Sequence, residues 1–512
     1  MNVLKPATLG RRAVLAGALL ALPFARTRAA GPAFAADPFS LGVASGCPTA
    51  DGCVLWTRLA PEPLEGGGLD EAAVEVGWEL AEDEGFSRIV RRGSARATAD
   101  EAHAVHAELR GLEPHRWYWY RFHAGSATSP VGRTRTAAAD GMAPLRLALA
   151  SCQQYEQGYF SAYRHMAREE LDLVVHVGDY IYELSWGRQH VRKHGTGIPT
   201  TLREYRNRYA LYKTDPDLQA AHAAFPWLVT WDDHEVADDY TADRSPFQAD
   251  PEIFKRQRAA AYRAFWEHMP LPAAMKPNGP DAAIHGGWRF GELAEIIVLD
   301  GRQYRSRHAC FEGKRGAGLT GDCAARLAPD RTMLGAAQED WLDARLAARN
   351  GRWTLLAQPT LMAQVDRGRD APAYWMDGWD GYPAARQRLI DGLVRHRVAN
   401  PVVLGGDVHS FWITDLKRDP TRPESPTVAS EIVGSSITSQ GPDPQYVARL
   451  LARNPPLKFG RSDRRGYALA RVSAARADIV LRAVDNVVDP DTGIADLARF
   501  AIEDGKPGAQ SA

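Results

Sequence analysis

The chain has 512 residues, of which 45% are hydrophobic and 24% are charged, and its formal net charge is −1. This length is enough for a large core and for more than one domain. The composition excludes an extensively disordered chain, and the lack of a basic excess gives no support to nucleic-acid binding.

The first 36 residues are predicted to be an export signal. Arg11-Arg12 directly precede an apolar run from Ala13 to Ala25, and small residues follow through Ala35. A twin arginine in this place indicates the Tat route, which exports folded proteins, and a chance arginine pair in an ordinary Sec signal is the alternative. Removal of the segment changes the formal charge from −1 to −6, because it carries five basic residues and no acidic one. We expect a periplasmic or secreted protein that uses the twin-arginine export machinery.

Five cysteines divide into two close pairs and one residue left over. Cys47 and Cys53 flank a short Gly/Pro loop, and Cys310 and Cys323 flank a Gly-rich one. We therefore expect two local disulfides in an oxidising compartment. Cys152 is the odd thiol, which taken alone would be interpreted as an inert buried residue. No segment after the signal has the uninterrupted apolar length of a transmembrane helix.

Two domains are predicted after the signal. Residues 37–140 carry short alternating runs between turn-rich segments, which is typical of a small β-sandwich. In residues 141–512 strands alternate with amphipathic helices, which indicates an α/β domain. The predicted strands are Leu145–Ala150, Leu173–Val177, Trp227–Trp231, Glu295–Leu299, Trp353–Ala357 and Val402–Leu404. The predicted helices include Tyr159–Glu170, Ile253–Met269, Gln338–Ala348 and Ala384–His396, and strands are expected to return between Tyr467 and Leu481.

Polar residues gather where these strands end, which is where α/β sheets bind ligands. The clusters are Ser151–Gln154, Gly178–Glu183, Asp232–Glu235, Asp300–Arg302, Gln358–Pro359 and Gly405–His409. Each has an ordinary structural explanation when taken alone, such as a helix cap for Asp179 or a satisfied core histidine for His409. Their order favours a phosphoesterase in which a shared carboxylate holds two metal ions about 3.5–4 Å apart. Asp179 is the candidate for that bridge.

These motifs resemble the calcineurin-like metallophosphoesterase superfamily and, within it, the PhoD-like alkaline phosphatases. The resemblance covers nearly the whole chain after the signal. It implies a four-layer α/β/β/α catalytic core preceded by the family's N-terminal β domain. The segments that carry it are Leu41–Gly46, Val54–Leu59, Ser151–Gln153, Trp231–Glu235, Asp300–Arg305, Trp379–Pro383 and Gly406–Ser410.

Departures from the superfamily pattern suggest which metals are bound. Cys152 stands where other members have an aspartate, so one metal would receive a thiolate, a phenolate from Tyr182, the Asp179 carboxylate and the His409 imidazole. Thiolate and phenolate donors suit ferric iron. The resemblance implies Fe³⁺ together with Ca²⁺.

The second position is expected to be an oxygen-only site. Asp233 replaces an amide of the superfamily pattern and Asp407 replaces an imidazole, and carboxylate oxygens suit calcium better than zinc. Asp232 either replaces or joins Asp233 as the ligand. One calcium ion and two remain alternatives.

Catalysis is expected to proceed by in-line attack of a metal-bound hydroxide on phosphorus, without a phosphoenzyme. His234 would contact the phosphoryl group or protonate the leaving oxygen, with Glu235 orienting it. Arg302 either reaches a phosphate oxygen or makes a structural ion pair. No serine nucleophile elbow and no phosphate-binding glycine loop with Lys and Ser/Thr is present.

The functional prediction is therefore an exported phosphoric ester hydrolase, an alkaline phosphatase that acts on phosphate monoesters, diesters or both. The alternative enzyme is a phospholipase D or a teichoic-acid phosphodiesterase, because the same metal core fits both bond types. A non-catalytic extracellular binding protein is the second alternative. It would be expected to have lost metal ligands, and all of them are present here.

Overall fold

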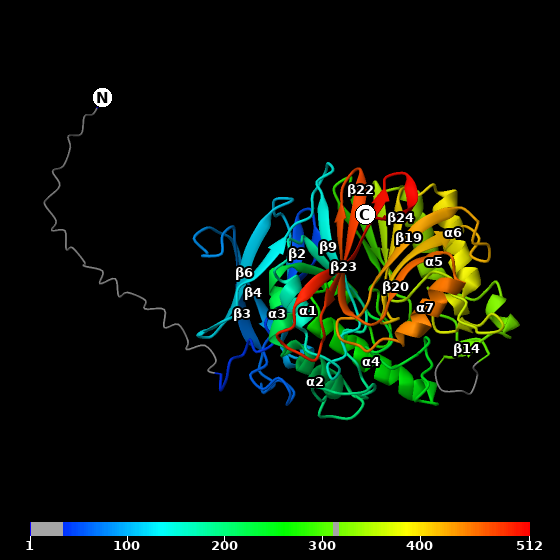
Figure 1. Cartoon of the computed structure of the whole chain (residues 1–512). Coiled ribbons are helices and arrows are strands. Elements are labelled where there is room, and N and C mark those ends of the chain that lie inside the picture. Colours follow the sequence, from blue (N-terminus) through cyan, green and yellow to red (C-terminus); the bar gives the residue numbers. More distant parts are fainter. Residues whose placement is uncertain (2–33, 311–316) are drawn as a thin grey trace.

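A computed structural model of the chain describes residues 34–310 and 317–512, together with Met1 (Figure 1). The predicted export signal therefore lies almost wholly outside the described residues. Their strands form sheets of ten, seven, five and two strands. No helix in the described ranges is long and apolar enough to cross a membrane.

The ten-stranded sheet has the order β24-β23-β22-β21-β9-β10-β11-β1-β2-β5. Its central strands β9, β10 and β11 are parallel and almost entirely buried, as expected for strands covered on both faces. The bounds are β1 Val43–Thr49, β2 Gly52–Arg58, β5 Ala104–Leu109, β9 Leu145–Ala150, β10 Leu173–Val177, β11 Pro226–Thr230, β21 Arg465–Val472, β22 Arg476–Val484, β23 Ile494–Glu503 and β24 Lys506–Ser511.

The seven-stranded sheet has the order β12-β13-β15-β17-β19-β18-β20, and β13, β15, β17 and β19 are parallel. Its bounds are β12 Gly286–Phe290, β13 Ala294–Val298, β15 Trp353–Ala357, β17 Pro401–Gly405, β18 Phe411–Lys417, β19 Thr427–Gly434 and β20 Leu457–Arg461. A separate two-stranded sheet pairs β14 (Leu319–Thr320) with β16 (Tyr374–Trp375).

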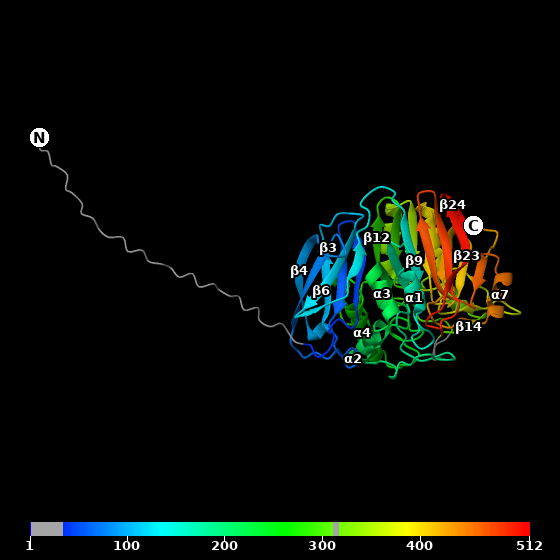
Figure 2. The ribbon, with the colours of Figure 1, turned by 60° about the vertical axis from the view of Figure 1, so that its left-hand side comes forward.

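The N-terminal strands form a five-stranded sheet that packs against part of the ten-stranded sheet. Its strands are β3 Val74–Ala81, β4 Ile89–Ala97, β6 Trp117–Ala124, β7 Ala127–Thr128 and β8 Gly132–Arg135. One hydrophobic cluster joins Val76 of β3 and Phe122 of β6 to Leu55 of β2 and Val105 of β5. Because β1 also pairs with β11, the ten-stranded sheet continues from this region into the rest of the chain. Figure 2 shows β3, β4 and β6 at one end of the molecule and β23 and β24 at the other.

Helices lie on the outer faces of both large sheets. α1 and α3 contact strands of the ten-stranded sheet, whereas α5 and α6 share a hydrophobic cluster with β13, β15 and β17 (Figure 1). An aspartate at the N-cap followed by proline begins α3, α4 and α7. The bounds are α1 Ser161–Met166, α2 Leu202–Lys213, α3 Pro216–Ala224, α4 Pro251–His268, α5 Ala336–Ala348, α6 Pro383–Arg395 and α7 Pro444–Arg453, with short 3₁₀ helices at Ala99–Glu101, Ala273–Met275, Ala324–Leu327 and Trp379–Gly381.

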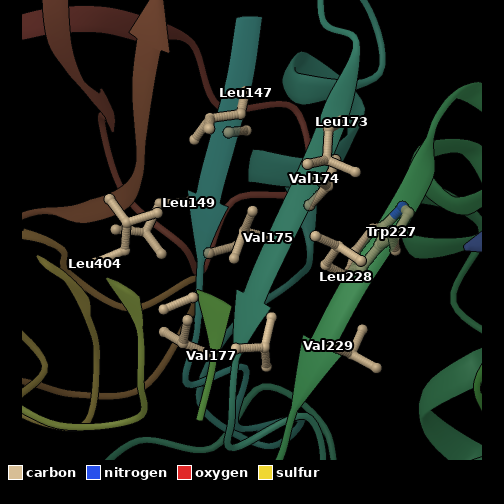
Figure 3. Close-up of a cluster of buried hydrophobic side chains, with 14 of the residues drawn as sticks. Leu147, Leu149, Leu173, Val174, Val175, Val177, Trp227, Leu228, Val229 and Leu404 are labelled. Carbon is tan, nitrogen blue, oxygen red and sulfur yellow. The ribbon is translucent and has the colours of Figure 1, made fainter. Parts of the chain in front are cut away.

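The main core lies between the two large sheets. Leu149 of β9 and Val175 of β10 belong to the same buried cluster as Leu404 of β17 (Figure 3). Leu355 of β15 is also part of this cluster. Contacts of β9 and β21 with β19 confirm that the sheets face each other. All six predicted strands are present within one or two residues of their bounds, and the four predicted helices correspond to α1, α4, α5 and α6.

One predicted disulfide is present and the other is wrong. Cys310 and Cys323 are bonded, but Cys47 and Cys53 are free and buried. The alternation of a β-strand explains the error, because Cys53 packs with Leu55 in the N-terminal cluster whereas Cys47 packs with Val54 in the main core. The two thiols therefore belong to different hydrophobic clusters.

Thiol counting tests this arrangement. Protein unfolded without reductant should expose three titratable thiols, from Cys47, Cys53 and Cys152, and reduction should raise the number to five. Alkylation before and after reduction, followed by mass spectrometry of peptides, gives the count and the positions. A peptide that links Cys47 to Cys53 would contradict the structure.

Candidate functional site

The predicted ligands converge at the carboxyl ends of strands from both large sheets. Cys152 follows β9, Asp179 and Tyr182 follow β10, and Asp232 and Asp233 follow β11 in the ten-stranded sheet. The seven-stranded sheet adds two more residues after β17, which are Asp407 and His409. Because the sheets face each other, residues more than 200 positions apart in the chain reach one place.

Four of these residues have a left-handed backbone. The φ angles are 59° at Cys152, 57° at Asp179, 65° at Asp407 and 47° at His409. Non-glycine residues rarely adopt this conformation, which costs on the order of 1 kcal/mol or more each and is concentrated at functional sites. The chain turns sharply at the end of each strand and thereby directs these side chains toward one another.

One group of donors combines sulfur, nitrogen and oxygen. Potential ligand atoms of Cys152, Asp179 and His409 lie within 4.8 Å of one another. The Tyr182 hydroxyl donates to Asp179 Oδ2 at 2.8 Å and lies 3.1 Å from His409 Nε2. The Ser439 hydroxyl oxygen lies 2.8 Å from the Tyr182 hydroxyl oxygen. All four predicted ligands of the iron position are thus together.

The His409 ring is prepared to act as a neutral ligand. Its Nδ1 lies 3.1 Å from the carbonyl oxygen of Gln440, which can only accept a hydrogen bond, so the ring proton belongs on Nδ1. Burial lowers the pKa of His409 to about 3. The Nε2 lone pair therefore faces Tyr182 and Asp179.

A second group of donors shares Asp179 with the first. Potential ligand atoms of Asp179, Asp233 and His234 lie within 4.8 Å of one another, and Asp233 forms a similar group with Asp238 and Asp239. Asp407 belongs to none of these groups, but it is half-buried, its charge interacts with that of Asp233, and it accepts a hydrogen bond from Thr360 at 2.9 Å. Asp179 is thus the residue common to the sulfur-containing group and to the acidic one.

The acidic residues have the properties of cation ligands. Asp179 Oδ1 and Asp232 Oδ2 are buried and accept no hydrogen bond from the described residues. Burial raises the pKa of Asp179 well above its ordinary value and that of Asp232 to about 8. Such carboxylates are costly to bury unless positive charge faces them. Bound metal ions fit this donor set.

Arg302 is fully buried and makes ion pairs. Its Nε donates to Asp232, and its Nη1 and Nη2 both donate to the carboxylate of Asp377 at 2.8 Å. Asp233 Oδ1 is 3.5 Å from Nη2. These contacts are those of the structural ion pair that was one of the two roles expected for Arg302. The guanidinium offsets the charge of carboxylates in and beside the candidate metal site.

Glu183, and not Glu235, orients His234. Glu183 Oε2 is 2.7 Å from His234 Nδ1, whereas Glu235 accepts backbone N–H groups of Tyr180 and Asp232 at 2.6 and 2.8 Å. The expectation for Glu235 is therefore wrong, because its side chain points back to join the loops that follow β10 and β11. Burial lowers the pKa of His234, but the charges of Glu183 and Asp233 outweigh it and leave this pKa well above its ordinary value.

Sequence reasoning did not assign roles to several residues of the site. Glu183 comes two residues after Ile181 and directly after the predicted ligand Tyr182, and that position in the sequence was the available signal. Asp377 lies two residues before the Trp379 motif, but no pattern marks it as the partner of Arg302. Trp379 itself is a buried residue of the hydrophobic core.

Two family models match the chain. "PhoD-like phosphatase" matches residues 147–481, and "PhoD-like phosphatase, N-terminal domain" matches residues 25–138. Alkaline phosphatase D of Bacillus subtilis (strain 168) is 45% identical over 491 residues, which is 94% of this chain and 83% of that protein. A solved structure of PhoD superposes with a TM-score of 0.90 at 44% identity, over 94% of this chain and 93% of that one. The chain belongs to the PhoD-like phosphatase family.

Proposed function

We propose that this protein is an exported, metal-dependent phosphoesterase that hydrolyses phosphate monoesters, diesters or both. The observation that carries the proposal is the position of Asp179, which belongs to both ligand groups of the site. Phosphate ester hydrolysis uses such a shared carboxylate to hold two cations close together. The 45% identity to a protein named alkaline phosphatase D supports the same reaction class.

The residues present suit Fe³⁺ at one position and Ca²⁺ at the other. Cys152, Tyr182, Asp179 and His409 would hold the iron, because thiolate and phenolate donors prefer it. Asp233 and Asp407, with the free oxygen of Asp232, would complete an oxygen-only calcium site beside Asp179. When bound, the cations supply positive charge for the phosphoryl oxygens and activate water.

His234 is the proposed general acid. Its Nδ1 proton is directed at Glu183, so Nε2 is the end that can carry a transferable proton. The carboxylates of Glu183, Asp233 and Asp179 raise the pKa of His234 and so favour the protonated ring. Donation to the leaving oxygen would then prevent an alkoxide from accumulating.

The proposal includes the architecture and the location. Residues 37–140 would be an N-terminal β-sandwich domain and residues 141–512 the catalytic domain, with a four-layer α/β/β/α core. The facing sheets with helices outside them support that arrangement. Residues 1–36 would be a Tat-type signal, and the mature protein would be periplasmic or secreted.

Replacing the shared carboxylate tests the reaction. Asp179→Asn should lower kcat/KM by more than about 100-fold, which exceeds the usual cost of losing a supporting partner of a metal ligand. Circular dichroism should show an unchanged fold. Measuring both proteins on a phosphate monoester and on a bis-ester also establishes which bond is preferred, and a fully active variant would refute the proposal.

The colour of the protein tests the iron assignment. Ferric iron bound to thiolate and phenolate should absorb visible light, so the purified protein should be coloured and contain iron. Cys152→Ser should shift or abolish the absorption band, while Cys47→Ser, which changes a buried thiol in another region, should leave it intact. An active preparation that is colourless and free of iron would remove the iron from the proposal.

The buried charge predicts a stability change in protein stripped of metal. Burial raises the pKa of Asp407 to about 6 in the folded state, above its ordinary value of 3.8. The folded state therefore holds the proton more tightly, so stability falls as pH rises from about 4 to 6 and stays lower above it. Asp407→Asn should stabilise the stripped protein by roughly 2–3 kcal/mol at pH 8 and by less at pH 4.

Thermal unfolding of wild type and Asp407→Asn at both pH values measures this effect. The same melting-temperature difference at pH 4 and pH 8 would show that the charge of Asp407 is not its cause. Ca²⁺ should reverse the order at pH 8, because only the wild type gains a ligand carboxylate.

A further inference from the structure

The Cys310–Cys323 disulfide is packed against the chain that leads into the site. Both cysteines belong to a small hydrophobic cluster with Met376. Within the loop that the disulfide closes, β14 pairs with β16, and the Met376 N–H donates to the Gly318 carbonyl at 3.1 Å. Met376 is followed directly by Asp377, so this pairing fixes the position of that aspartate.

Asp377 is the centre of a buried ion-pair network. Besides the two hydrogen bonds from Arg302, its carboxylate accepts one from Arg305 Nη1 at 2.9 Å and lies 2.8 Å from His308 Nε2. His308 lies two residues before Cys310. Arg302 extends the network to Asp232. One route of contacts therefore runs from the disulfide through Asp377 and Arg302 to a carboxylate of the site.

A second route reaches Asp233. The Ala317 N–H donates to Asp239 Oδ2 at 2.8 Å, and the Asp239 N–H donates to Asp233 Oδ2 at 2.7 Å. Ala317 lies between the two bonded cysteines in the chain and packs against their hydrophobic cluster. Both routes end on Asp232 and Asp233, which we call the acidic half of the site.

The sulfur-containing half of the site, which comprises Cys152, Tyr182 and His409, is held by contacts with a different segment of the chain. Tyr182 is held by Ser439, and His409 by the Gln440 carbonyl, both in the segment between β19 and α7. The Cys152 carbonyl accepts a hydrogen bond from the Ser439 hydroxyl at 2.8 Å. None of these contacts involves the disulfide or its neighbours, so the two halves can be perturbed separately.

We propose that the Cys310–Cys323 disulfide is a positioning element for the acidic half of the metal site, and that it sets the calcium affinity through Asp377 and Arg302. A covalent bridge restricts the chain on either side of it. Groups that support metal ligands commonly change metal affinity 10- to 100-fold. This inference rests on the proposed function, since it presumes a cation at Asp232 and Asp233.

The test compares a Cys310→Ala/Cys323→Ala double variant with wild type and with Cys47→Ala, a matched loss of a buried cysteine elsewhere. Ca²⁺ binding to chelator-treated protein is measured by calorimetry, and visible absorption reports on the sulfur-containing half. We expect about 10-fold weaker Ca²⁺ binding in the double variant alone, with an unchanged absorption band in all three proteins. Affinity within twofold of wild type would overturn the inference.

A second variant tests the same contact route if the double variant does not fold. His308→Ala keeps the disulfide but removes one partner of Asp377, and it should also weaken Ca²⁺ binding several-fold. Unchanged affinity in His308→Ala would contradict the contact route. Absence of Ca²⁺ binding in the wild type would instead refute the proposed function. Failure of the proposed function can therefore be distinguished from failure of this inference.

Discussion

The mutual repulsion of buried carboxylates around Asp179 is the constraint on which the rest of the structure depends. Asp179, Asp232 and Asp233 are nearly inaccessible to solvent, and Asp407 stands beside them. Arg302 is the guanidinium that pairs with this group, and it is shared with Asp377. His234 is a second cationic side chain beside Asp179 and Asp233, and its pKa is raised by their charges. The carboxylates of the site outnumber these two side chains in the described residues, which is the reason for assigning cations to the site.

The fold provides the rigidity that this concentration of charge requires. Parallel strands buried on both faces end at the site from two sheets, and a common hydrophobic core holds those sheets together. Four of the candidate ligands, Cys152, Asp179, Asp407 and His409, have a left-handed backbone where the chain leaves these strands. Around them lie fixed partners such as Glu183 for His234 and Gln440 for His409. Stability of the core is thus used to hold strained and charged groups in place.

Much of this arrangement could be predicted from the sequence, and the reasons are physical. Strands such as Leu173–Val177 are continuous apolar runs, so their bounds were identified closely. The candidate ligands that directly follow them were predicted from residue type and order, and the structure brings Cys152, Asp179 and His409 together. The helix Leu202–Lys213 was not predicted, because its many polar residues give only a weak apolar stripe, although Thr201 and Glu204 form a capping box.

Partners that depend on long-range contacts could not be predicted. Asp377 accepts a hydrogen bond from Arg302, which lies 75 residues away in the chain, and no local sequence pattern indicates this pair. The Cys47–Cys53 disulfide was expected from proximity in sequence, whereas strand alternation sends the two side chains into different clusters.

Anomalous X-ray diffraction from crystals of the untreated protein tests the central claim most directly. Data collected on both sides of the iron edge should place one iron atom among Cys152 Sγ, Tyr182 Oη, Asp179 and His409. A lighter ion should lie between Asp179 and the Asp233 and Asp407 carboxylates. Crystals of active protein with no ion bound to Asp179 would contradict the account.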